Sequence, residues 1–130
     1  MADLKEKSIS LMSTTTGIDA TSVATTTLYT VPAGKTFIPM FVVIRVTAYT
    51  EGTKNTEATA SFGGNSATYD DFLNSVQYAV ANANYFQTDG PTDDTAVPVQ
   101  SAGSEFKVSV EVGSNADVET WAVDLFGYLV

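Results

Sequence analysis

Apolar and polar residues alternate most regularly in residues 36–50. One set of alternate positions is wholly apolar and consists of Met40, Val42, Ile44, Val46 and Ala48. The opposite set is mixed and consists of Phe41, Val43, Arg45, Thr47 and Tyr49. A period of two places successive side chains on opposite faces of a strand, so this segment predicts a long β-strand with the first set facing the core. Pro39 has no N–H to donate, so we expect the strand to begin at an edge or to bend there.

Shorter segments of the same kind recur along the chain, separated by turn residues. They predict strands over residues 28–31, 57–62, 96–100 and 106–112, and a final strand through residues 121–129. One face of the final strand holds Trp121, Val123, Leu125 and Leu129, and the other holds Ala122, Asp124, Phe126 and Tyr128. We predict a bulge at Gly127. Residues 32–35, PAGK, predict a turn that closes a hairpin, because Pro32 presets φ and Gly34 accepts a left-handed conformation.

Three segments have weaker patterns. Residues 67–86 fit both helical and strand spacing, and we expect about one helical turn near residues 69–74 followed by strand. Residues 87–95 read as a loop. Residues 8–27 are rich in Ser and Thr and predict an extended arm or an edge strand. We take residues 1–22 as the extended N-terminal arm and residues 23–130 as a single β-sandwich domain. Together these elements predict an all-β fold, an antiparallel β-sandwich of jelly-roll or Greek-key type with at most one short helix.

Composition excludes several classes of function. The 130 residues contain no histidine and no cysteine, which removes the usual imidazole base and metal ligand, the thiolate nucleophile and any disulfide. The net charge of −9 disfavours binding to nucleic acid and to anionic membranes, because both need clustered Lys and Arg. Charged residues near the N-terminus do not fit a signal peptide, so we expect synthesis in a cytoplasm. We expect no enzyme, no catalytic residue, no cofactor and no dedicated metal site.

Acidic residues in the expected loops raise the alternative of a calcium site. They are Asp70, Asp71, Asp89, Asp93 and Asp94. Carboxylate oxygens are calcium ligands, but the spacing does not match an EF-hand loop. Solvated turn-forming carboxylates explain the same pattern.

Apolar residues on the expected outward faces of the two longest strands are the candidate interface. The set consists of Phe41, Val43, Arg45, Tyr49, Phe126 and Tyr128. Exposed apolar positions rimmed by polar groups mark association sites. A second packed layer inside the sandwich would explain the same pattern. Arg45 is the single arginine of the chain and fits either an ion pair across an interface or a surface side chain.

Two segments carry a resemblance to a known group of proteins. Residues 26–36, TTLYTVPAGKT, followed by a long apolar strand, and residues 123–129, VDLFGYL, resemble small β-sandwich structural proteins of tailed bacteriophages. These include head decoration (cement) proteins and related tail or fibre proteins, and the resemblance covers about residues 22–130. It implies a non-enzymatic virion protein, a homo-oligomer that is often a trimer, and the major capsid protein or another virion protein as partner.

We therefore expect a decoration protein bound to the capsid exterior, with a tail or fibre component as the alternative. Docking should depend on salt, with Arg45 and Lys35 as the first cations to test. A carbohydrate-binding module is a third possibility, in which Trp121, Tyr69, Tyr78 or Tyr85 would form a stacking platform.

Overall fold

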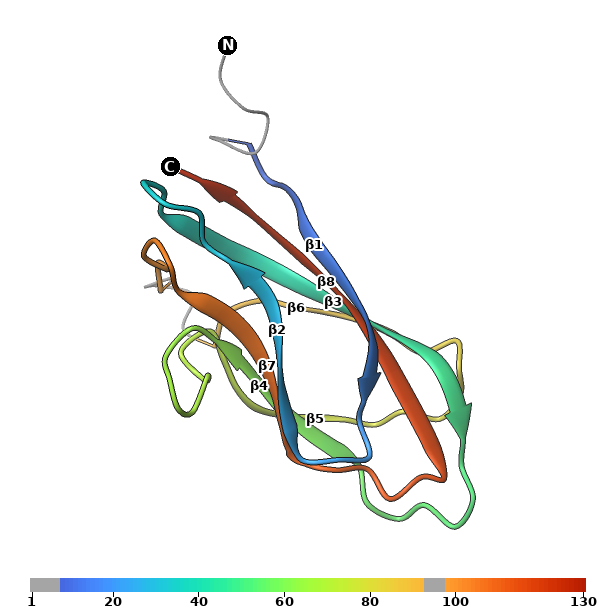
Figure 1. Ribbon diagram of the computed structural model, residues 1–130. Helices are drawn as coiled ribbons and strands as arrows, with labels where there is room; N and C mark the ends of the chain where they lie inside the picture. Colours follow the sequence, from blue (N-terminus) through green and yellow to red (C-terminus); the bar gives the residue numbers. More distant parts are fainter. Residues whose placement is uncertain (1–7, 93–97) are drawn as a thin grey trace.

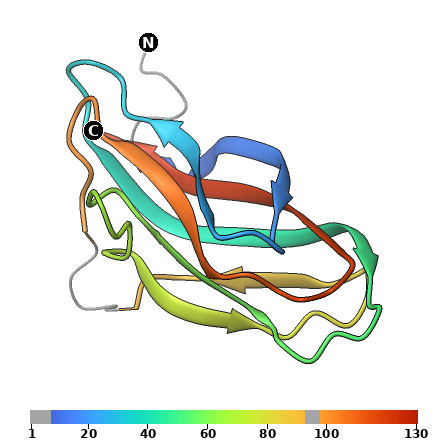
Figure 2. The same cartoon turned by 60° about the horizontal axis from the view of Figure 1, so that its bottom comes forward.

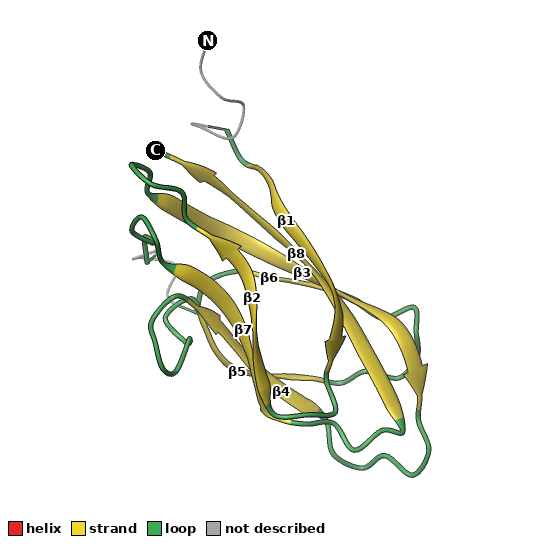
Figure 3. Ribbon diagram, in the orientation of Figure 1, coloured by secondary structure: helices red, strands yellow, loops and turns green. Residues whose placement is uncertain are grey.

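The computed structural model describes residues 8–92 and 98–130. This part of the chain contains eight β-strands joined by turns and loops, and it contains no helix (Figure 3). The strands are β1 (Ser10–Asp19), β2 (Ala24–Thr30), β3 (Phe37–Thr50), β4 (Ala58–Gly63), β5 (Leu73–Tyr78), β6 (Phe86–Asp89), β7 (Glu105–Val112) and β8 (Val118–Leu129). The long alternating segment 36–50 and the alternating C-terminal segment thus form the two longest strands, as predicted.

The strands form two antiparallel sheets of four that face each other (Figures 1 and 2). The first sheet has the order β1-β8-β3-β6 and the second the order β2-β7-β4-β5. Successive strands alternate between the sheets except β4 and β5, which pair in the second sheet, and this is the strand order of an eight-stranded jelly roll. The predicted all-β sandwich is confirmed.

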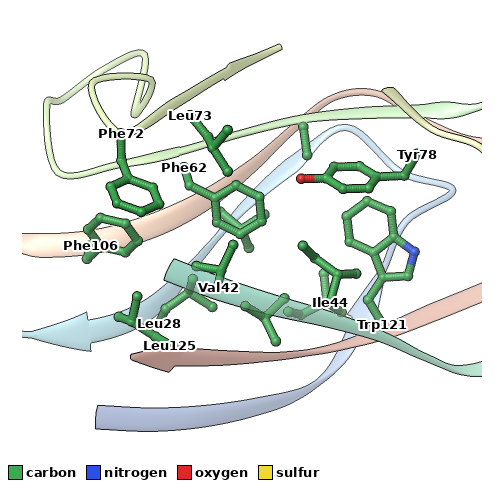
Figure 4. Packing of buried hydrophobic residues seen from close by; sticks show 14 of the residues in the cluster. Leu28, Val42, Ile44, Phe62, Phe72, Leu73, Tyr78, Phe106, Trp121 and Leu125 are labelled. Atoms are coloured by element: carbon green, nitrogen blue, oxygen red, sulfur yellow. The ribbon is translucent and has the colours of Figure 1, made fainter. Parts of the chain in front are cut away.

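The core lies between the sheets and is rich in aromatic rings (Figure 4). Trp121 and Tyr78 meet edge to face with ring centroids 5.2 Å apart, and Phe72 and Phe106 do so at 5.5 Å. The predicted inward face of the last strand is fully buried or nearly so at Trp121, Val123, Leu125 and Leu129. Edge-to-face geometry suits the ring quadrupoles, and the Trp121–Tyr78 contact joins β8 of the first sheet to β5 of the second.

Two β-bulges change the phase of β3. Pro39 lies opposite Gly127 and Phe41 opposite Phe126, so Met40 is the extra residue, and Thr47 is extra between Val46 and Ala48. Gly127 itself pairs regularly, so the bulge predicted at Gly127 occurs in the strand beside it. The second bulge points Ala48 outward and turns Tyr49 inward, where it packs against the core.

The turn at residues 32–35 forms as predicted but does not close a hairpin. Gly34 has φ +73°, and the Lys35 N–H donates to the Pro32 carbonyl over 3.2 Å. Because β2 lies in the second sheet and β3 in the first, this turn carries the chain across the sandwich. The expectation of a hairpin was wrong because a turn motif does not specify which sheet the next strand joins.

The helical turn expected near residues 69–74 is absent. Asn65 organises this loop instead, since its side-chain oxygen accepts the N–H groups of Asp70 (2.8 Å) and Asp71 (3.0 Å). Strand β5 follows, as predicted.

The segment from residue 86 to residue 100 differs from its prediction. Residues 86–89, placed largely in a loop, form β6 at the edge of the first sheet. The strand expected over residues 96–100 is reduced to a single bridge between Gln100 and Phe37, with residues 96 and 97 outside the described residues.

The Ser/Thr-rich N-terminal segment contains an edge strand, one of the two expected alternatives. Strand β1 pairs with β8, and its Met12 and Ile18 are buried. No helix long and apolar enough to cross a membrane occurs in the described residues.

Candidate interaction surface

The outer face of the first sheet carries a cluster of aromatic and aliphatic side chains. Residues directly opposite each other on neighbouring strands project from the same face of a sheet. Leu11 lies opposite Phe126, which lies opposite Phe41, and the two phenyl rings stack with centroids 4.6 Å apart at 15°. Tyr128 lies opposite Ile38 in the next outward-facing row. We call these rows, together with those of Val43 and Arg45, the aromatic face.

An ion pair occupies the middle of the aromatic face. Arg45 Nε donates to Asp124 Oδ2 over 2.9 Å and Nη2 donates to Oδ1 over 3.0 Å, while the Thr14 hydroxyl donates to Oδ1 over 2.9 Å. The hydrogen bond from Arg45, helped by that from Thr14, lowers the pKa of Asp124, and the same bond raises the pKa of Arg45. Arg45 is thus paired within its own chain, and the two charges cancel on the surface.

The two margins of the aromatic face are its most exposed apolar positions. Leu11, on the edge strand β1, is 47% exposed, and Phe86, on the edge strand β6 opposite Arg45, is 64% exposed. Neither residue was predicted to belong to the interface, because each lies in a segment with little apolar patterning. Their membership follows from strand pairing with β8 and β3, which a pattern within one segment does not report.

Five predicted interface residues lie together on this face: Phe41, Val43, Arg45, Phe126 and Tyr128. Val43 points outward but is only 8% exposed. Tyr49 was predicted to join them and does not, because the bulge at Thr47 turns it toward the core. The Lys54 ammonium lies 5.1 Å from the centroid of the Tyr49 ring and also pairs with Glu57.

The outer face of the second sheet is polar, and we call it the polar face. Across it, Thr25 lies opposite Ser109 and Ser109 opposite Ser61, while Thr27 lies opposite Lys107. Glu111 accepts hydrogen bonds of 2.6 Å from the hydroxyls of both Ser61 and Ser75. The outer faces of the two sheets therefore differ in chemistry, because the rows of the aromatic face include the exposed Leu11 and Phe86, whereas those of the polar face hold Ser, Thr and Lys side chains.

The stacking platform of a carbohydrate-binding module is not formed by the residues proposed for it. Trp121 and Tyr78 are 0% exposed. Burial raises the pKa of the Tyr78 hydroxyl, which donates to Asp89 over 2.9 Å. The Tyr69 ring is covered by Lys107, whose ammonium lies 5.0 Å from the ring centroid, and Tyr85 is partly buried against the core.

The loop carboxylates are engaged in local hydrogen bonds. Asp70 accepts from Asn65 over 2.7 Å and from Thr68 over 2.8 Å, which lowers its pKa. Asp71 accepts the Gly64 N–H, and Asp89 accepts from Tyr78 and Gln87. In residues 8–92 and 98–130, no group of three acidic side chains is placed to hold a metal ion. Asp93 and Asp94 lie outside the described residues.

Comparison with known proteins gives structural neighbours only. No protein-family model and no curated protein matches the sequence. A chain from the capsid of Ralstonia phage GP4 is similar in structure, with a TM-score of 0.60, 15% identity, and coverage of 98% of this chain and 88% of that one. A chain from the acid-stable capsid of Helicobacter pylori bacteriophage KHP30 matches with a TM-score of 0.55 and 10% identity over 94% of both chains.

A third match is a chain from the capsid asymmetric unit of cyanophage Pam1, with a TM-score of 0.55 and 10% identity, covering 98% of this chain and 89% of that chain. At sequence identities this low, the three structural matches establish a shared fold and nothing more. Since nearly the whole of both chains is covered in each comparison, the shared unit is the entire sandwich.

Proposed function

We propose that this chain is a non-enzymatic structural protein of a bacteriophage virion, and more specifically a decoration (cement) protein that oligomerises and binds the capsid exterior. The observation that carries the proposal is the likeness over nearly the full length to chains in three phage capsid structures. The resemblance in residues 26–36 and 123–129 supports the same class.

The distribution of side chains supports a binding role rather than a catalytic one. The chain has no histidine or cysteine, and no pocket occurs among its described residues. What the described surface offers instead is an aromatic face with one internal ion pair on the first sheet and a polar face on the second. Such a surface suits a subunit that is held between a partner and solvent. The partners that we propose are further copies of this chain, as a trimer, and the major capsid protein.

Co-sedimentation with capsids tests the proposal. Purified protein is mixed with heads of the encoding phage that lack it, and the heads are pelleted. We expect the protein in the pellet, saturating at a fixed number of copies per head. Separately prepared tails are the matched control. Binding to tails alone would indicate a tail or fibre component, and binding to neither would refute the virion role. Immunogold labelling of intact virions gives an independent location.

The charge of −9 leads us to expect that capsid docking depends on salt. Arg45 on β3 and Lys35 in the turn between β2 and β3 are the first cations to test. We expect Lys35→Gln to weaken docking, whereas Glu51→Gln, which removes a charge of opposite sign from another exposed turn, should not. Equal docking by all three proteins over a range of salt would show that docking is not electrostatic.

A further inference from the structure

We infer that the aromatic face is where copies of this chain contact one another. The inference rests on the part of the proposed function in which the chain oligomerises, and it does not depend on binding to a capsid. It assigns a surface and an occupant, which is the same face of a second copy.

The exposed margins indicate that the aromatic face is covered in the working form of the protein. Leu11 and Phe86 lie on opposite edge strands of one sheet at 47% and 64% exposure, with the stacked Phe41 and Phe126 between β1 and β6. Leu11 with the two stacked rings forms one exposed apolar patch and Phe86 forms another, separated on the same sheet face by the row of Val43 and Asp124. Patches of this kind mark association sites.

Charge favours a second copy as the occupant. Two copies carrying −9 each repel, and they approach most easily where the surface has no net charge. In the described rows of the aromatic face the only charged side chains are Arg45 and Asp124, and they neutralise each other. Covering this face therefore buries a paired Arg45 and Asp124 and leaves no unpaired charge out of water. Burying an unpaired charge is what would be strongly unfavourable. A partner recognised by opposite charge would find no net charge here to bind.

Native mass spectrometry and sedimentation velocity test the inference. Wild-type protein is compared with Leu11→Asp, Phe86→Asp and the control Thr27→Asp, which adds the same charge at an exposed position of the polar face. We expect the wild type and the control to form the same oligomer and each aromatic-face variant to raise the Kd for association at least about tenfold. Both substitutions on the aromatic face are at exposed positions, and circular dichroism checks that each variant is folded.

The inference is overturned if the wild type is monomeric, or if the aromatic-face variants associate as tightly as Thr27→Asp. Its failure is distinguishable from failure of the virion role. If Phe86→Asp disrupts the oligomer and the wild type binds no phage particle, the contact between copies is supported and the virion role is rejected. A monomeric wild type whose capsid binding is lost in Phe86→Asp would assign the face to the capsid instead.

Discussion

Arg45 and Asp124 join β3 to β8 on the surface of the first sheet. The bond is bidentate, and Asp124 is the more shielded partner, at 17% side-chain exposure against 37% for Arg45. Partly exposed pairs contribute little, so we expect Asp124→Asn to lower the free energy of unfolding by about 0.5–1 kcal/mol near neutral pH. Urea unfolding measures this value, with Glu51→Gln as the control that removes an unshielded carboxylate.

The pH dependence of that difference identifies its cause. Hydrogen bonds from Arg45 and Thr14 hold the pKa of Asp124 below its usual 3.8 in the folded protein. A carboxyl group with a lowered folded pKa stabilises fully above its unfolded pKa, and the contribution is lost as the pH falls through the folded pKa. The gap between wild type and Asp124→Asn should therefore be constant above 3.8 and close below it. A gap that persists in acid would mean that the asparagine acts through packing.

Trp121 combines apolar packing with one polar contact in the core. It is 0% exposed, meets Tyr78 edge to face, and its indole N–H donates to the buried Glu119 over 3.0 Å. Trp121→Phe removes volume and leaves a buried carboxylate oxygen without its donor, so we expect a loss of about 2–3 kcal/mol in unfolding free energy.

Thermal melts followed by circular dichroism measure the loss at Trp121. Thr120→Ser, at the other neighbouring position of β8 and only half-buried, is the comparison and should cost less. A Trp121→Phe protein as stable as the wild type would contradict the packing and the hydrogen bond described here.

At the scale of single elements, β8 lies so close to β3 at Gly127 that only glycine fits there. A Cβ on Gly127 would lie 2.3 Å from the Ile38 carbonyl oxygen and 2.6 Å from a ring carbon of Phe37. Backbone and a buried ring cannot move cheaply, so we expect Gly127→Ala to cost about 1–3 kcal/mol. Gly90→Ala is the matched control, since its Cβ would meet only a carbonyl at 3.8 Å. Similar unfolding free energies for the two variants would refute this close approach.

Alternation of apolar and polar residues predicted where the long strands lie, but it predicted less well which of their side chains face the core. Alternation located β3, β7 and β8, because each has enough residues for a period of two to be visible. The bulges at Met40 and Thr47 could not be read this way, since they arise where β3 must match β8. The four residues of β6 were too few for a pattern, and the strand exists because β3 offers them an edge. Both errors reflect pairing between distant segments.

At the scale of the whole molecule, the same limit applies to the candidate surface. The outward placement of the candidate interface residues on β3 and β8, Tyr49 apart, was predictable because apolar side chains on the outer face of a long strand are visible in a period of two. Leu11 and Phe86 join them only once the sheet order places β1 and β6 at its two edges. The contrast between aromatic and polar faces is likewise a property of two sheets together.

The net charge of the whole molecule gives the proposed self-contact a characteristic dependence on salt. Copies that carry −9 repel over long distances, while the aromatic face that they would share is neutral. Raising the ionic strength from 0.01 M to 0.15 M shortens the screening length from about 30 Å to about 8 Å and so weakens the repulsion. We therefore expect added sodium chloride to lower the Kd for self-association, measured by sedimentation equilibrium. An interface held by ion pairs between copies would respond in the opposite direction, so a Kd that rises with salt would contradict a neutral, apolar contact. Phe86→Asp places a charge at the margin of the face, and its association should gain more from salt than that of the wild type.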